Sequence, residues 1–272
     1  MSKVNFSVWD KDNVLGTALW EIKNEDGSLS SHAWATVLSD FLGEQGDFWY
    51  ANGGKIELNN AKTKDDIIRQ VELVLDVEKG SLKQAAIRAR HSWEKFNRNN
   101  QIFTFLNEFF GEELNIPIIN ARIWPSSLCP YQKDGFCISS KSTPSRVLLT
   151  CVHEIMHLYW WQVWNKNFDK DDKSSWFLSE MAVETIKRNT SLNEIFSEYL
   201  PNAGNIAHNQ FYSIEIRGKN VFDELDKIYA KSNYEIVPFM KSAYEFVNNN
   251  FFEINNQYYD VPKKEDKSKE KL

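Results

Sequence analysis

The segment Thr143–Trp164 reads TPSRVLLTCVHEIMHLYWWQVW and is the most strongly patterned part of the chain. Thr143 is a good residue to cap the start of a helix, and Pro144 suits the first helical position. The apolar residues that follow cover most of a helical circumference, so the segment predicts a helix that belongs in the protein core. Two histidines and a glutamate interrupt this apolar surface.

The chain of 272 residues has the composition of an ordinary globular protein. Hydrophobic residues make up 42%, charged residues make up 26%, and the formal net charge is −6. These values are poor fits to wholesale disorder, collagen-like structure and coiled coil. An acidic chain without a long basic block lacks the electrostatic footprint of nucleic-acid binding, so we expect no nucleic-acid partner.

The sequence also predicts a cytosolic protein that does not span a membrane, and a mature secreted form whose signal has already been removed is the alternative. The longest apolar stretch, Arg146–Trp164, contains charged and imidazole side chains, whereas a membrane span needs about 20 predominantly apolar residues. The first residues show no apolar signal segment. The three cysteines, Cys129, Cys137 and Cys151, are too few for a disulfide scaffold. We therefore expect a cytoplasmic protein.

Residues 1–115 read as short strands followed by helices, without recognisable chemistry. Phe48–Tyr50 and Lys55–Leu58 flank the turn signal Asn52-Gly53-Gly54 and are predicted to pair as a hairpin. Beyond them, apolar residues recur at helical spacing, and Gly80 is predicted to separate two helices. The sequence assigns no role to this N-terminal region.

Residues 116–260 read as a few strands followed by helices. Strands are expected at 118–123 and 136–139, and an α-rich part follows the helix that begins at Pro144. Residues 261–272 form a charge-dense tail that we expect to be disordered. The pattern of the whole chain predicts an α+β fold.

The polar residues of the apolar helix form the pattern HExxH, His153-Glu154-Ile155-Met156-His157. Residues four apart on a helix share one face, so both imidazoles can reach a single Zn²⁺ ion. Glu154 lies beside them and is well placed to accept a proton from zinc-bound water. Unpaired polar groups in an apolar helix are costly, and a zinc ion with its water would satisfy all three. The alternative is a pair of core histidines hydrogen-bonded to backbone groups or carboxylates.

A catalytic zinc ion has three protein ligands and one open position, so a third ligand is needed. No histidine follows His157 closely, which favours a carboxylate. Glu180 and Glu184 lie one turn apart among apolar residues on the next predicted helix. We predict that Glu180 binds the metal and that Glu184 accepts a hydrogen bond from the ring of His153. Swapped roles, or two exposed helix carboxylates, are the alternatives.

This set of residues resembles the gluzincins, the zinc metallopeptidases that include thermolysin and the relatives of alanyl aminopeptidase. The resemblance covers about residues 118–187. Within it, Trp176–Glu180 echoes the Trp-Leu-x-Glu sequence around the third ligand in the aminopeptidase branch. The resemblance implies a zincin-like catalytic core, in which a small sheet joins an active-site helix. It also implies a zinc ion held by His153, His157 and Glu180, with Glu154 as the general base.

A peptide or protein substrate is implied by the same resemblance. If the strand at 136–139 lies at an exposed edge, its backbone can pair with an extended peptide, and the alternative is an ordinary internal strand. Gly135–Ser139 keeps only the glycine of the Gly-x-Met-x-Asn stretch of the aminopeptidase branch, so exopeptidase specificity is not indicated. The family also uses a tyrosine or histidine to stabilise the oxyanion. The candidates here are Tyr212, Tyr229, Tyr234, Tyr244 and His208.

The sequence therefore favours a zinc metallopeptidase. One alternative of a different class is a binding or regulatory module that keeps a zincin-like core without catalysis. A third hypothesis is a zinc hydrolase that acts on non-peptide amides. The sequence does not indicate an oligomeric state.

Overall fold

The computed structural model describes residues 2–9, 48–51, 55–58, 64–124, 131–132, 134–169, 172–200 and 205–260. Cys129 and the predicted tail at 261–272 lie outside these residues. The chain divides into two compact units, Met1–Thr104 with Leu114–Ile155 and Phe105–Glu113 with Met156–Leu272. The units therefore interleave along the chain, whereas the predicted regions 1–115 and 116–260 are consecutive. None of the described helices has the length and apolarity of a transmembrane span.

The first unit is built on a small, mainly parallel sheet. Its strands are β1 (Lys3–Val8), β4 (Ile118–Trp124), β5 (Tyr131–Gln132) and β6 (Gly135–Ser139), in the order β1-β4-β6-β5. β4 pairs in parallel with both β1 and β6, and β5 pairs with β6 in antiparallel orientation. The start of the chain thus shares a sheet with strands more than 100 residues later. Helices combined with this small sheet are compatible with the predicted α+β class.

Strand β6 lies between β4 and β5, so of the two alternatives for this strand the exposed edge does not apply where β5 pairs. Phe136 faces Tyr131 of β5 on one side and Ala121 of β4 on the other. Gly135 is likewise paired with both neighbours. The alternative of an internal strand is the one observed at these two residues.

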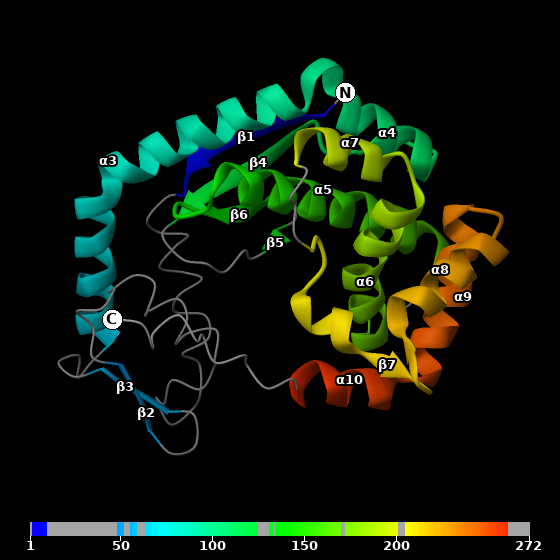
Figure 1. Ribbon diagram of the computed structural model, residues 1–272. Coiled ribbons are helices and arrows are strands. Elements are labelled where there is room, and N and C mark those ends of the chain that lie inside the picture. The colour runs from blue at the N-terminus through cyan, green and yellow to red at the C-terminus, as the bar shows by residue number, and fades with distance from the viewer. Residues whose placement is uncertain are drawn as a thin grey trace, which may run out of the picture. The chain divides into compact units, whose positions relative to one another are not determined.

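Helix α3 (Lys64–Phe96) is continuous through Gly80, so the predicted break is wrong. A glycine in a helix interior costs only about 1 kcal/mol relative to alanine. The helical face beyond it is well buried, with Leu82, Ala89 and Trp93 all less than 5% exposed. Burial of this face outweighs the weak helix propensity of the glycine. Figure 1 shows α3 running beside β1.

The predicted hairpin in the first part of the chain is confirmed. β2 (Phe48–Ala51) and β3 (Lys55–Leu58) form the expected antiparallel hairpin. After the short helix η2 (Arg98–Asn100), α4 (Gln101–Phe110) ends where Gly111 adopts a positive φ of 73°. Glycine is the residue that adopts this left-handed conformation most readily, which explains why the helix stops there.

The second unit is largely helical. Its elements after the second half of α5 (Pro144–Asn167) are α6 (Lys173–Asn189), α7 (Leu192–Tyr199), η3 (Asn209–Ser213), β7 (Glu215–Ile216), β8 (Lys219–Asn220), α8 (Val221–Lys231), α9 (Ile236–Asn249) and α10 (Phe251–Asp260). α6 packs against α7, α8 and α9 (Figure 1). This unit accounts for the α-rich part that the sequence predicts.

The close approach of β4 and β6 at Gly135 predicts that a side chain there lowers the stability of the protein. A Cβ atom added there would overlap the backbone carbonyl of Asn120. We expect Gly135→Ala to lower the free energy of unfolding by about 1–3 kcal/mol, as overpacking does elsewhere. Urea unfolding followed by circular dichroism measures this difference.

Gly80→Ala is the matched control, because nothing lies within 4 Å of a Cβ added at Gly80 in the middle of α3. It should raise the free energy of unfolding by about 0.5–1 kcal/mol. Equal stabilities of the Gly135 variant and the unsubstituted protein would contradict the steric argument.

Candidate metal centre

Helix α5 carries the HExxH residues on one continuous helix. Its predicted cap is present, because the Thr143 hydroxyl accepts a hydrogen bond of 3.2 Å from the backbone N–H of Arg146. The helix places His153 and His157 one turn apart on the same face. Both histidines and Glu154 are buried, at 8%, 5% and 7% exposure.

Glu154 lies beside the first histidine of the motif. Its Oε1 atom is 4.0 Å from Nε2 of His153. A carboxylate at this position on the helix can accept a proton from a water molecule held by the neighbouring imidazoles or their metal.

The next helix brings Glu180 to the second histidine. Its Oε1 atom lies 3.4 Å from Nε2 of His157, and the side chains are 8% and 6% exposed. α6 begins at a well-formed cap, because the side chain of Asp172 accepts from the backbone N–H of Ser175 and the Ser175 hydroxyl pairs with the backbone of Asp172. Because the first turn of α6 is fixed in this way, the position of Glu180 beside His157 is fixed too.

Glu184 is engaged elsewhere on the same helix. Its Oε2 atom accepts a hydrogen bond of 2.6 Å from the Tyr212 hydroxyl and one of 3.1 Å from Nζ of Lys187. Glu180, and not Glu184, is therefore the carboxylate that contacts His157. The hydrogen bond predicted between Glu184 and His153 stays a prediction.

Four of the five candidate oxyanion groups are tyrosines, and the structure ties three of them to other partners. Tyr212 donates to Glu184. Tyr244 donates to Asp172 at 2.6 Å, and Tyr229 donates to the carbonyl oxygen of Tyr234 at 3.2 Å. Tyr234 is itself 60% exposed.

The fifth candidate, His208, is the one that contacts a predicted metal ligand. Its Nε2 atom lies 3.5 Å from Oε2 of Glu180. The other ring nitrogen, Nδ1, lies 2.9 Å from the hydroxyl of Tyr258 on α10. Burial, together with the negative charge of Glu180, raises the pKa of Tyr258 to about 12. The phenol therefore stays neutral at physiological pH.

Sequence reasoning missed α10 and Tyr258. Tyr258 lies in a segment of mixed polar and aromatic residues without a motif, and its histidine partner lies 50 positions earlier. No local pattern can signal a contact of that separation.

Glu180 and His208 of the second unit lie close enough together to share one metal ion. Glu180 and His208 offer ligand atoms within 4.8 Å of one another, and the two contacts of Glu180 with histidine nitrogens measure 3.4 and 3.5 Å. Bonds of about 2.0–2.1 Å to a tetrahedral zinc ion place neighbouring ligand atoms about 3.3–3.4 Å apart. Two imidazoles and a carboxylate are also the donor types that zinc accepts, so the residues fit this metal.

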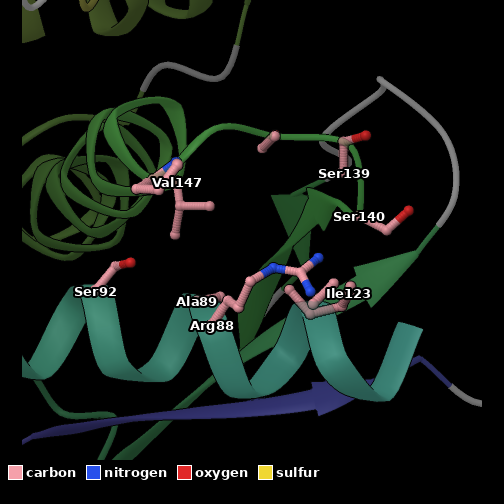
Figure 2. A pocket seen from close by; sticks show the side chains of 10 residues that line it. Arg88, Ala89, Ser92, Ile123, Ser139, Ser140 and Val147 are labelled. Atoms are coloured by element: carbon pink, nitrogen blue, oxygen red, sulfur yellow. The ribbon is translucent and has the colours of Figure 1, made fainter. Parts of the chain in front are cut away.

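A separate small cavity lies in the first unit and has a different character. It has a volume of about 70 Å³ and is lined by α3 and by residues from the ends of β4 and β6 to the start of α5. Figure 2 shows the side chain of Arg88 extending from α3 toward Ile123. The cavity holds none of the candidate ligands and is too small for a peptide, so it is not the centre described above.

Comparisons with family models, with curated proteins and with solved structures give no match. The gluzincin resemblance therefore stays a prediction that rests on His153–His157 and Glu180. To this motif the structure adds the contacts of Glu180 with two histidines.

The contact between Tyr212 and Glu184 predicts a structural role for this pair. Burial and the hydrogen bond to the carboxylate raise the pKa of Tyr212. Tyr212→Phe removes a hydrogen bond to a charged group, so the free energy of unfolding at pH 7 should fall by about 1.5–3 kcal/mol. Guanidinium unfolding at a series of pH values measures it.

The sign of the pH dependence follows from the raised pKa. Above pH ~10 a tyrosine ionises in the unfolded chain, whereas Tyr212 keeps its proton in the folded protein. Ionisation therefore stabilises the unfolded state of the unsubstituted protein, which loses stability that the variant never had. The difference between the two proteins should thus shrink above pH ~10. Tyr259→Phe, at a side chain that is 61% exposed, is the control and should change little. A deficit that grows with pH would contradict this account.

Proposed function

We propose that this protein is a zinc-dependent hydrolase that acts on a peptide or protein, with its metal held by His153, His157 and Glu180. The observation that carries the proposal is the contact of 3.4 Å between Glu180 and His157 in buried surroundings. Taking a carboxylate out of water costs several kcal/mol unless a partner compensates it. A divalent cation shared with imidazoles provides that compensation.

The reaction is a hydrolysis in which Glu154 moves the proton. Zinc bound at such a site supplies Lewis acidity, which polarises a carbonyl group and lowers the pKa of a coordinated water. Glu154 takes the proton of the attacking water and passes it to the leaving amine. The Glu154 carboxylate lies 4.0 Å from the imidazole of His153, so the base would stand beside a metal held by that histidine.

The architecture and the cysteines agree with a cytoplasmic enzyme of the zincin type. The first half of α5 belongs to the same unit as the small parallel sheet of β1, β4 and β6. A small sheet with an active-site helix is what the gluzincin resemblance implies. Cys137 and Cys151 are buried, and the low cysteine content of the chain fits a reducing compartment.

One observation favours a second candidate, a zinc-binding module without catalysis. His208 brings a fourth protein donor to Glu180, and zinc sites with four protein ligands are generally structural. Such a module would hold zinc and bind a partner without cleaving any peptide. One cleavage product that a chelator abolishes would exclude it.

The ligand assignment predicts the metal content of two variants. Glu180→Ala removes a ligand. It should weaken zinc affinity more than the loss of an outer hydrogen-bond partner does, and that loss costs about 10–100-fold. Glu184→Ala, on the same helix, should retain more metal because its carboxylate contacts Tyr212 and Lys187. Mass spectrometry of protein purified without chelator or added zinc measures the content. Equal zinc loss in both variants would disprove the assignment.

The mechanism predicts the behaviour of Glu154→Gln. The amide has nearly the same shape but cannot take up the proton, so turnover should fall by about 10²–10⁴-fold or more while the metal content stays unchanged. A peptide-library digest with and without chelator gives the turnover. Hydrolysis at the unsubstituted rate by this variant would remove Glu154 from the mechanism.

A further inference from the structure

We infer that His208 is a fourth, displaceable ligand of the proposed metal site, and that Tyr258 of the C-terminal helix is the positioning residue that holds it there. The inference rests on the proposed metal site and adds its regulation. In the resting state the fourth coordination position is taken by the protein itself, and a substrate must displace His208 to reach the metal.

The carboxylate of Glu180 presents one oxygen to each of two histidines. Oε1 lies 3.4 Å from Nε2 of His157, and Oε2 lies 3.5 Å from Nε2 of His208. Both nitrogens are the outer ring atoms, and they approach one carboxylate at nearly equal distances. A metal ion bound at Glu180 therefore has the His208 nitrogen within ligand reach.

The opposite side of the His208 ring is held by α10. Nδ1 of His208 lies 2.9 Å from the Tyr258 hydroxyl, and the two rings are nearly parallel, at 26°. Ligation through Nε2 would leave the ring proton on Nδ1, and the Nδ1–H group would then donate a hydrogen bond to the Tyr258 oxygen. Metal-binding histidines generally have such a partner on the other ring nitrogen, which fixes their orientation.

Tyr258 is itself fixed by an aromatic cluster. Its ring lies 4.7 Å from that of Phe211, 5.3 Å from that of Phe177 and 6.0 Å from that of Trp176. Phe177 and Trp176 belong to α6, the helix that carries Glu180. One cluster thus sets the positions of both Glu180 and the tyrosine that holds His208.

His208 differs from the other donors in its exposure and its place in the fold. Its side chain is 43% exposed, whereas those of Glu180 and His157 are 8% and 6% exposed. It also lies immediately before the short helix η3, outside any regular element. The exposed ring of His208 can therefore turn toward solvent, whereas the side chains of Glu180 and His157 are enclosed by the protein.

The test uses the full-length protein loaded with Co²⁺, whose visible spectrum reports the ligands, and acetohydroxamate as an added metal ligand. If His208 occupies the fourth position most of the time, removing it should tighten the apparent Kd of acetohydroxamate by about tenfold or more, since apparent affinity scales with the open fraction. His208→Ala should show this gain. Tyr258→Phe, which keeps the ring packing but loses the hydroxyl, should show a smaller gain.

Tyr259→Phe is the control, because this neighbour on α10 is largely exposed and should leave the Kd unchanged. His208→Gln repeats the measurement if the alanine variant fails to fold. Peptide turnover separates a displaceable ligand, which we call the latch, from a catalytic role of His208. Displacement predicts that kcat/KM rises in His208→Ala, whereas a histidine that acts on the substrate would lower kcat when removed.

The outcomes distinguish this inference from the proposed function. Protein that takes up no Co²⁺ overturns both. Uptake that is lost in Glu180→Ala, together with an unchanged acetohydroxamate Kd in His208→Ala, upholds the metal site and overturns the latch. A fall in kcat in His208→Ala likewise overturns the latch.

Discussion

One buried carboxylate, that of Glu180, is the constraint on which the chemistry of the second unit depends. It is 6% exposed and faces a histidine nitrogen from each of its two oxygens. Removing such a group from water is unfavourable unless its partners are placed accurately. The positions of His157 on α5 and of His208 before η3 are therefore coupled through this single side chain.

The start of α6 is built so that Glu180 reaches this position. Asp172 caps the helix through Ser175, and the Tyr244 hydroxyl of α9 donates to the same aspartate. The side chain of Ser174 also bonds to Asn248 of α9. An anchored first turn fixes the rotation of the helix, and with it the face that carries the glutamate two turns later. Tyr244, a candidate oxyanion group by sequence, is thus a structural residue of the cap.

How much of the structure could be predicted depended on the distance along the chain over which each signal acts. The cap at Thr143 and the hairpin of β2 and β3 are local, and their patterns predicted them correctly. The predicted helix break at Gly80 was wrong. The glycine signal is local, whereas burial of the α3 face that follows Gly80 depends on the sheet. The pairing of β1 with β4 joins segments over 100 residues apart, and alternating patterns do not specify such partners.

The same limit applies within the candidate site. The spacing of HExxH places two imidazoles on one face because helix geometry requires it. The choice of Glu180 over Glu184 needed the rotation of α6 against α5, which sequence alone left open. His208 could be named only as one of five candidates, and its partner Tyr258 could not be named at all.

The distances around Glu180 also bear on whether the carboxylate needs a cation. If either imidazole donated a charge-assisted hydrogen bond to it, the nitrogen and oxygen would lie about 2.7–2.9 Å apart. The observed separations of 3.4 and 3.5 Å are longer than such hydrogen bonds. The same separations suit atoms that share a metal ion without touching one another. A cation between Glu180 and the histidines would be attracted by all of these electron-rich atoms, which is the physical reason for proposing a metal at these residues.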